Sequence, residues 1–157
     1  MVLKKLLKTL SVVLLLVMLL STVVTVQAAP EILPETVEST AEGLVTLKAP
    51  EQLASSTTNK KLPISATAPQ GSTVTVYRYN TTTGQYHKIW NGEAAMESVI
   101  GSTMLFAGQV DLDAGKNKFL IRGGWNEEIY TVTKFEVTVL NEGFMDRIKG
   151  VISVIFG

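Results

Sequence analysis

Between Leu44 and Leu140 the chain is divided into short runs in which apolar and polar residues alternate, and this pattern most constrains the fold. The clearest run, Thr73 to Tyr79, reads TVTVYRY and is rich in β-branched and aromatic residues, which favour strands. Seven such runs in about 97 residues predict an all-β domain, a β-sandwich of about seven strands over residues 43–140. The runs are 44–48, 62–67, 73–79, 86–90, 104–112, 118–122 and 129–140. Only residues 94–100 (AAMESVI) suggest a helical turn.

Turn residues separate the runs and fix where the chain reverses. Gly71 ends a Pro-x-Gly turn, and Gly115 lies between two runs; both positions favour the positive φ that glycine adopts readily. Asn117 is expected to hydrogen-bond across the second turn, and Asn91-Gly92 is a favoured tight-turn pair. The alternation predicts the core residues Val74, Val76, Val110, Leu112, Phe119, Ile121, Val137 and Val139.

Residues 1–28 are typical of a signal peptide that directs export. Three lysines (Lys4, Lys5 and Lys8) precede the apolar run 10–20. Val26 and Ala28 then provide the short side chains that a signal peptidase reads, which predicts cleavage after Ala28. An uncleaved membrane anchor stays open, because residues 10–26 reach the lower limit for spanning a bilayer. Both interpretations place the rest of the chain outside the cytoplasm, in the extracellular space or at the cell surface.

The charge balance changes once the leader is set apart. The whole chain has a formal net charge of zero. Without the three leader lysines, 11 basic residues face 14 acidic ones, a net charge of −3. A mildly acidic surface disfavours nucleic acid as a partner. The chain has no cysteine, which excludes thiol catalysis, cysteine-based zinc sites and disulfides.

Residues 29–42 (APEILPETVESTAE) contain two prolines and four acidic residues without apolar periodicity. This composition predicts an extended acidic spacer that holds the domain away from the leader.

Three segments carry a resemblance to a known family. Residues 62–76 resemble the second and third strands of bacterial Ig-like domains of surface proteins, and residues 131–139 resemble their last strand. Residues 110–121 resemble their strand–turn–strand unit, which ends in G-x-N-x-F. The resemblance covers about two thirds of the exported part, and it implies an immunoglobulin-like β-sandwich at a bacterial surface. The sequence departs from it at residues 86–103 and after Leu140, and its motifs carry no catalytic residue.

Motifs for catalysis and metal binding are weak. His87 is the only histidine, and no G-x-S-x-G or S-x-x-K motif accompanies it, so an edge or surface histidine is favoured over a catalytic one. The spacing Asp111-x-Asp113-x-Gly115-x-Asn117 partly matches a calcium loop, but the glycine and the final glutamate are misplaced. We therefore expect no enzyme activity, no metal and no cofactor. A small hydrolase is the least favoured alternative.

Two aromatic features are candidates for ligand binding. Tyrosines on neighbouring runs and the two tryptophans could stack on sugars or hold a peptide; the residues are Tyr77, Tyr79, Tyr86, Trp90 and Trp125. The competing interpretation is that two or three of them cover the edge of the core.

Residues 141–157 form a third part of the exported chain. On a helix, seven apolar side chains fall on one face; they are Phe144, Met145, Ile148, Val151, Ile152, Ile155 and Phe156. This pattern predicts an amphipathic helix, although the β-branched residues also allow a strand. It could pack on its own domain, lie in a membrane interface or dock on a partner.

The sequence thus predicts an exported, non-enzymatic binding or structural module that contacts a protein or glycan of the cell envelope. The alternative is an accessory protein attached to a bilayer or a partner complex through its C-terminal helix.

Overall fold

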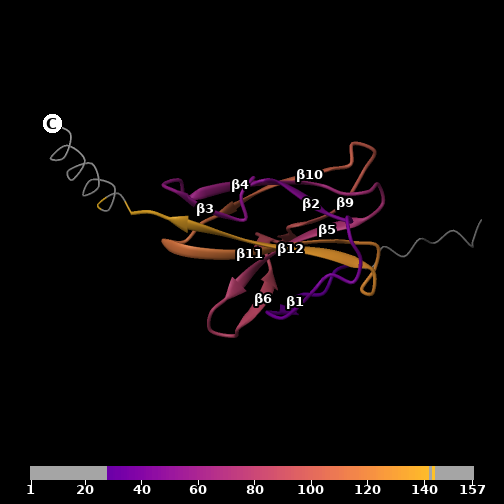
Figure 1. Ribbon diagram of the computed structural model, residues 1–157, viewed down its shortest axis with the longest axis horizontal. Helices are drawn as coiled ribbons and strands as arrows, with labels where there is room; N and C mark the ends of the chain where they lie inside the picture. The colour runs from indigo at the N-terminus through magenta and orange to yellow at the C-terminus, as the bar shows by residue number, and fades with distance from the viewer. Residues whose placement is uncertain (1–27, 142, 144–157) are drawn as a thin grey trace, which may run out of the picture.

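The computed structural model describes residues 28–141 and 143, and this part of the protein is all-β (Figure 1). Its strands are β1 (Ile32–Pro34), β2 (Thr46–Ala49), β3 (Ala54–Thr57), β4 (Lys61–Thr67), β5 (Thr73–Asn80), β6 (Gln85–Lys88), β7 (Trp90–Asn91), β8 (Ala94–Ala95), β9 (Glu97–Val99), β10 (Leu105–Asp111), β11 (Gly115–Gly124) and β12 (Tyr130–Val139). Each of the seven predicted runs overlaps a strand, and five further short strands are present in the described residues.

The strands form two main sheets and a small hairpin in the described part of the chain. The larger sheet has the order β1-β6-β5-β11-β12-β3, with β9 paired to β5, and the second has the order β10-β4-β2. All pairs are antiparallel except β12 with β3. Figure 1 shows β4 and β10 on one side of the long strands β11 and β12, with β1 and β6 on the other.

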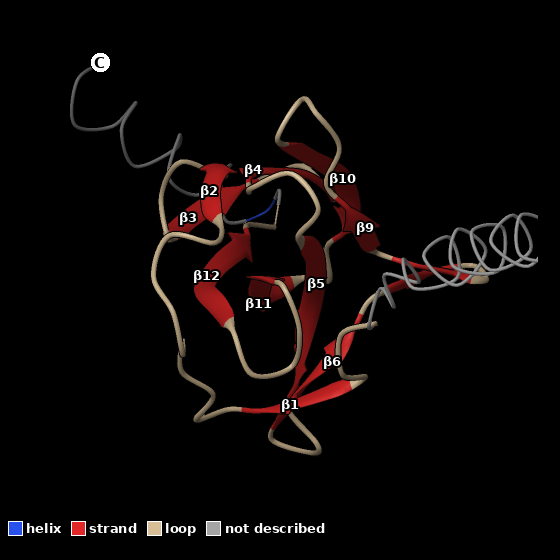
Figure 2. Cartoon of the chain, turned by 90° about the vertical axis from the view of Figure 1, so that its right-hand side faces the viewer, coloured by secondary structure: helices blue, strands red, loops and turns tan. Residues whose placement is uncertain are grey.

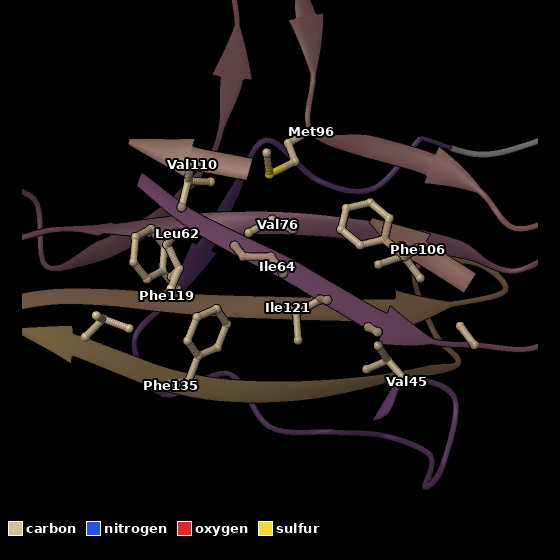
Figure 3. Packing of buried hydrophobic residues seen from close by; sticks show 14 of the residues in the cluster. Val45, Leu62, Ile64, Val76, Met96, Phe106, Val110, Phe119, Ile121 and Phe135 are labelled. Atoms are coloured by element: carbon tan, nitrogen blue, oxygen red, sulfur yellow. The ribbon is translucent and has the colours of Figure 1, made fainter. Parts of the chain in front are cut away.

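The main core lies between the two sheets (Figure 3). Ile64 and Val110 of the smaller sheet face Phe119 and Ile121 of the larger one, and the rings of Phe119 and Phe135 stack at 5.4 Å between centroids. Seven of the eight predicted core residues are buried, and Val139 is partly buried at the end of β12. Strand alternation predicted them because one face of each sheet is covered by the other.

The predicted helical turn at residues 94–100 is wrong. This segment contains β8 and β9, and Val99 pairs with Thr73 of β5. Met96 and Ile100 are buried in the main core. Pairing with an open strand edge and burial of two large side chains outweigh the helix propensity of Ala, Met and Glu.

The prediction of a spacer over residues 29–42 also needs correction. Leu33 of β1 and Val37 are buried in a second apolar cluster with Tyr77, Tyr86 and Leu120. Further along, the Thr40 amide donates to the carbonyl of Tyr130 at 2.9 Å. The segment therefore covers the outer face of the larger sheet, because the apolar and tyrosine side chains of that face need a cover.

The two predicted turn glycines have the expected conformation, with φ of +85° at both Gly71 and Gly115. Gly123 and Gly124 are the last two residues of β11. A Cβ atom on Gly123 would lie 2.6 Å from the Cβ of Val45. Glycine here allows the chain before β2 to approach β11 closely.

The predicted signal peptide, apart from Ala28, and the predicted helix face from Phe144 to Phe156 lie outside the described residues. Within the described residues, no helix is long and apolar enough to cross a membrane.

Candidate functional site

The three tyrosines proposed as ligand contacts share one face of the larger sheet, and that face is covered. Tyr77 is fully buried and Tyr86 is 4% exposed. Tyr79 packs edge-on against Tyr86 at 5.2 Å and donates its hydroxyl to Glu35 at 2.9 Å. The Lys118 ammonium lies 4.8 Å from the centroid of the Tyr79 ring. These rings serve mainly to pack the N-terminal segment onto the sheet.

The two tryptophans are exposed but lie in different places. Trp90 belongs to the β7–β8 hairpin and is 51% exposed. Trp125 is 46% exposed, and its ring approaches Gly71 in the turn before β5. Trp90 lines a groove that Trp125 does not reach, so the five aromatics do not form one continuous surface.

The groove beside Trp90 is the best candidate for a binding site. It has a volume of about 470 Å³ and lies between the β5–β6 hairpin, the start of β7 and the end of β10. Its lining combines one exposed indole with charged, amide, hydroxyl and imidazole groups; the residues are Arg78, Tyr79, Asn80, Thr81, His87, Lys88, Ile89, Trp90, Asn91, Val110 and Asp111.

One wall of the groove is built around Arg78. Its guanidinium lies 5.3 Å from the centroid of the Phe119 ring, and Nη1 pairs with Asp113 at 3.0 Å. Nη2 also donates to the carbonyl of Asp111, whose carboxylate lies 3.6 Å from Lys61. These contacts hold the guanidinium plane in place, and the Asp111 side chain is 83% exposed.

The tip of the β5–β6 hairpin forms the other wall. The side-chain Oδ1 of Asn80 accepts from the backbone amides of Thr82 and Thr83 at 2.8 and 3.3 Å, which fixes the turn. The Thr83 hydroxyl lies 3.0 Å from His87 Nε2. His87 pairs with Arg78 across the two strands, so both side chains lie on the groove face of the sheet.

The turn that partly matched a calcium loop is held by internal contacts. Asn117 donates to the carbonyls of Asp113 and Gly115 at 2.8 and 3.0 Å and accepts from the Asp113 amide at 2.9 Å. The residue thus hydrogen-bonds across the turn, as predicted. In the described part of the chain, no group of three or more His, Asp or Glu side chains is placed to hold a metal ion.

A second, larger cavity of about 750 Å³ lies at the end of β12. Its lining contains no ring and no carboxylate among the described residues; it consists of Thr58, Lys60, Ala114, Gly115, Val139, Leu140 and Asn141. The smaller groove has the more specific chemistry, because an aromatic plane and several polar groups meet there.

Sequence reasoning identified Trp90 but missed Arg78, Asn80 and Asp111 as its neighbours. The alternation along β5 puts Arg78 on the same face as Val74 and Val76. What the sequence does not give is the proximity of the end of β10 to the β5–β6 hairpin, which depends on how the two sheets pack.

Comparison with known proteins adds no assignment, since neither a protein-family model nor a curated protein matches the chain.

Proposed function

We propose that this protein is an exported, non-enzymatic immunoglobulin-like module that binds a glycan of the bacterial cell envelope. The Trp90 groove carries the proposal. An exposed indole offers a flat apolar face for a sugar ring. Arg78, Asp111 and His87 offer donors and acceptors to its hydroxyl groups. An envelope protein is the other partner class that the same groove could serve.

The sheet order supports the immunoglobulin-like assignment. In that fold, strands A, B and E share one sheet, and strands C, F and G share the other. Here β2, β4 and β10 correspond to A, B and E, and β5, β11 and β12 correspond to C, F and G. At the corner between β10 and β11, Asn117 bonds back to Asp113. Many immunoglobulin domains use a tyrosine for a similar purpose at this corner.

The leader supports export, because lysines, an apolar run and a Val-x-Ala site follow one another in the order of a signal peptide. The C-terminal amphipathic helix stays part of the proposal as a second attachment. Removing residues 143–157 tests it. Loss of envelope association without loss of thermal stability would favour a membrane or partner contact, and loss of stability would favour packing on the domain.

Comparing the two tryptophans tests the groove. The exported protein is incubated with purified bacterial cell-wall glycan, and the bound fraction is measured for wild type, Trp90→Ala and Trp125→Ala. The two side chains are similarly exposed, so Trp125→Ala is a matched control for the loss of one surface indole. We expect Trp90→Ala to weaken binding about tenfold or more, in keeping with the loss of an aromatic anchor, and Trp125→Ala to change it less than twofold.

Equal binding by all three proteins, or stronger loss with Trp125→Ala, would contradict the groove as the binding site. Capture that persists after the glycan has been digested, but is lost after the envelope proteins have been removed, would assign the groove to a protein partner instead.

A further inference from the structure

The backbone nitrogen of Ala29 points at a carboxylate. It donates to Glu97 Oε2 at 3.1 Å, and Ala29 is 5% exposed. The same oxygen accepts from the Thr75 hydroxyl at 2.9 Å and lies 3.2 Å from Lys88 Nζ. Ala29 is also the first residue after the cleavage site that the sequence predicts.

Three consecutive carbonyls that follow this nitrogen are also bound. The Ala29 carbonyl accepts from Lys88 Nζ at 2.6 Å, and the Pro30 carbonyl accepts from the Tyr77 hydroxyl at 2.8 Å. The Glu31 carbonyl accepts from the Lys88 amide at 2.9 Å. The chain is thus held residue by residue from Ala29 onward, whereas Ala28 is exposed.

The topology explains how these contacts arise. Strands β9 and β6 pair with successive parts of the same edge of β5 (Figure 2). Glu97 at the start of β9 and Lys88 at the end of β6 therefore meet beside Thr75 and Tyr77. The first residues of the described chain then pass over their side chains.

Two carboxylates share one cation at ion-pair distance in this cluster. Lys88, with a side chain 2% exposed, contacts two carboxylates, Glu97 at 3.2 Å and Glu31 at 3.1 Å. Among the described residues, Lys88 is the one cation within ion-pair distance of Glu97. Arg122 lies on the same sheet face and interacts with Glu97 at longer range, but its guanidinium donates to the Asn126 carbonyl. Cleavage before Ala29 would add one positive charge on an atom that already contacts Glu97.

We infer that the Ala28–Ala29 bond is a processing site and that the new α-ammonium group of Ala29 completes a buried cluster with Glu97, Lys88 and Glu31. The inference rests on the proposed export. Peptide hydrolysis consumes one water and leaves the Ala28 carboxylate on the leader and the amine on Ala29. The amine is protonated near neutral pH and then pairs with Glu97. Because Ala29 is buried in the folded domain, cleavage has to precede folding, as it does when a leader is removed during export.

The experiment begins with the full chain, expressed with its own leader in an exporting bacterium. The mass and the N-terminal residue of the exported protein are determined. We expect a chain that starts at Ala29. Retention of the whole chain in the cytoplasm would contradict the proposed export. An exported chain that keeps its leader, or starts at another residue, would overturn the inference about Ala29 alone.

A second comparison tests the ion pair itself. One alanine is inserted between Ala28 and Ala29, so that cleavage after Ala28 leaves the ammonium one residue away and returns Ala29 to an amide. We expect the melting temperature of this exported protein to fall by about 5 °C, roughly the effect of losing one partly buried ion pair in a domain of this size. Glu97→Gln keeps a hydrogen-bond acceptor but removes the charge. It should abolish most of the difference in melting temperature between the wild-type N-terminus and the N-terminus with the inserted alanine.

Glu93→Gln, at an exposed carboxylate in the neighbouring hairpin, is the matched control and should leave that difference intact. Two results would overturn the proposed ammonium pair and show an ordinary amide hydrogen bond at Ala29. One is a protein with the inserted alanine that melts at the wild-type temperature. The other is a difference in melting temperature that Glu97→Gln leaves unchanged.

Discussion

At the scale of single residues, polar side chains buried in or beside the sheets serve as fixed structural contacts. Asn117 is 4% exposed and binds both the amide and the carbonyl of Asp113 across its turn. Arg122 is 2% exposed, donates to the Asn126 carbonyl at 2.6 Å and lies 4.4 Å from the Tyr130 ring centroid; burial lowers its pKa. A buried polar group without a hydrogen-bond partner is unfavourable. Removing one partner should therefore lower the free energy of unfolding by more than the hydrogen bond itself contributes.

Asn117→Ala tests this directly. The change leaves the Asp113 amide and carbonyl without their side-chain partner, and it should lower the free energy of unfolding by about 2 kcal/mol. Denaturant titration followed by tryptophan fluorescence measures the loss. Asn59→Ala, at an exposed asparagine, is the control and should cost less than about 0.5 kcal/mol. Equal losses in the two variants would show that the Asn117 contacts contribute little.

The buried phenol of Tyr77 predicts a dependence of stability on pH. Burial raises the pKa of Tyr77 well above its ordinary value of 10, and burial also raises that of Tyr86. The folded state therefore holds these protons more tightly than the unfolded chain does. Their contribution to stability is complete below about pH 10 and is lost as the pH rises above that value.

We expect the denaturant midpoint to fall steeply between pH 9.5 and about pH 11.5, the range set by the ordinary tyrosine pKa. The fall should be shallower in Tyr77→Phe, which has no phenolic proton to lose. A slope in Tyr77→Phe as steep as that of the wild type would count against this assignment.

At the scale of elements, the segment from Ala29 to Ala41 closes the outer face of the larger sheet. Its composition predicts an extended spacer, because it contains two prolines and three acidic residues. Two of its apolar residues, Leu33 and Val37, are four positions apart and are buried together with Tyr77. A segment that covers a sheet in this way buries single side chains and not one side of a regular strand or helix. Its apolar residues therefore do not recur with a fixed period, and the sequence pattern does not reveal the packing.

Neighbouring residues of β1 provide a matched pair of variants. Leu33 is 7% exposed, whereas Ile32 is 46% exposed. Leu33→Ala should lower the free energy of unfolding by about 2–4 kcal/mol, because it removes a buried side chain and leaves a cavity. Ile32→Ala should cost about 0.5 kcal/mol or less. Similar small effects in both variants, measured by denaturant titration, would show that residues 29–41 are a spacer after all.

At the scale of the whole molecule, the sequence predicts the long central strands well because their alternation is strong. Val76 and Phe119 were assigned to the core on that basis. The short strands β3 and β9 carry too few residues for a period to emerge, and they form because a neighbouring strand edge offers hydrogen bonds. The same holds for the candidate site. Trp90 can be proposed from the sequence alone, whereas its neighbours in the groove are known only once the packing of the two sheets is known.

The central claim is that the Trp90 groove binds envelope glycan. The chain has two tryptophans, so a ¹⁵N-labelled sample of the exported protein gives two indole N–H signals, which Trp90→Phe and Trp125→Phe assign. Titration with soluble glycan fragments released from bacterial cell wall should shift the Trp90 signal in a saturable way and leave the Trp125 signal in place. A saturable shift of the Trp125 signal alone, or no shift of either signal at saturating glycan, would contradict the claim.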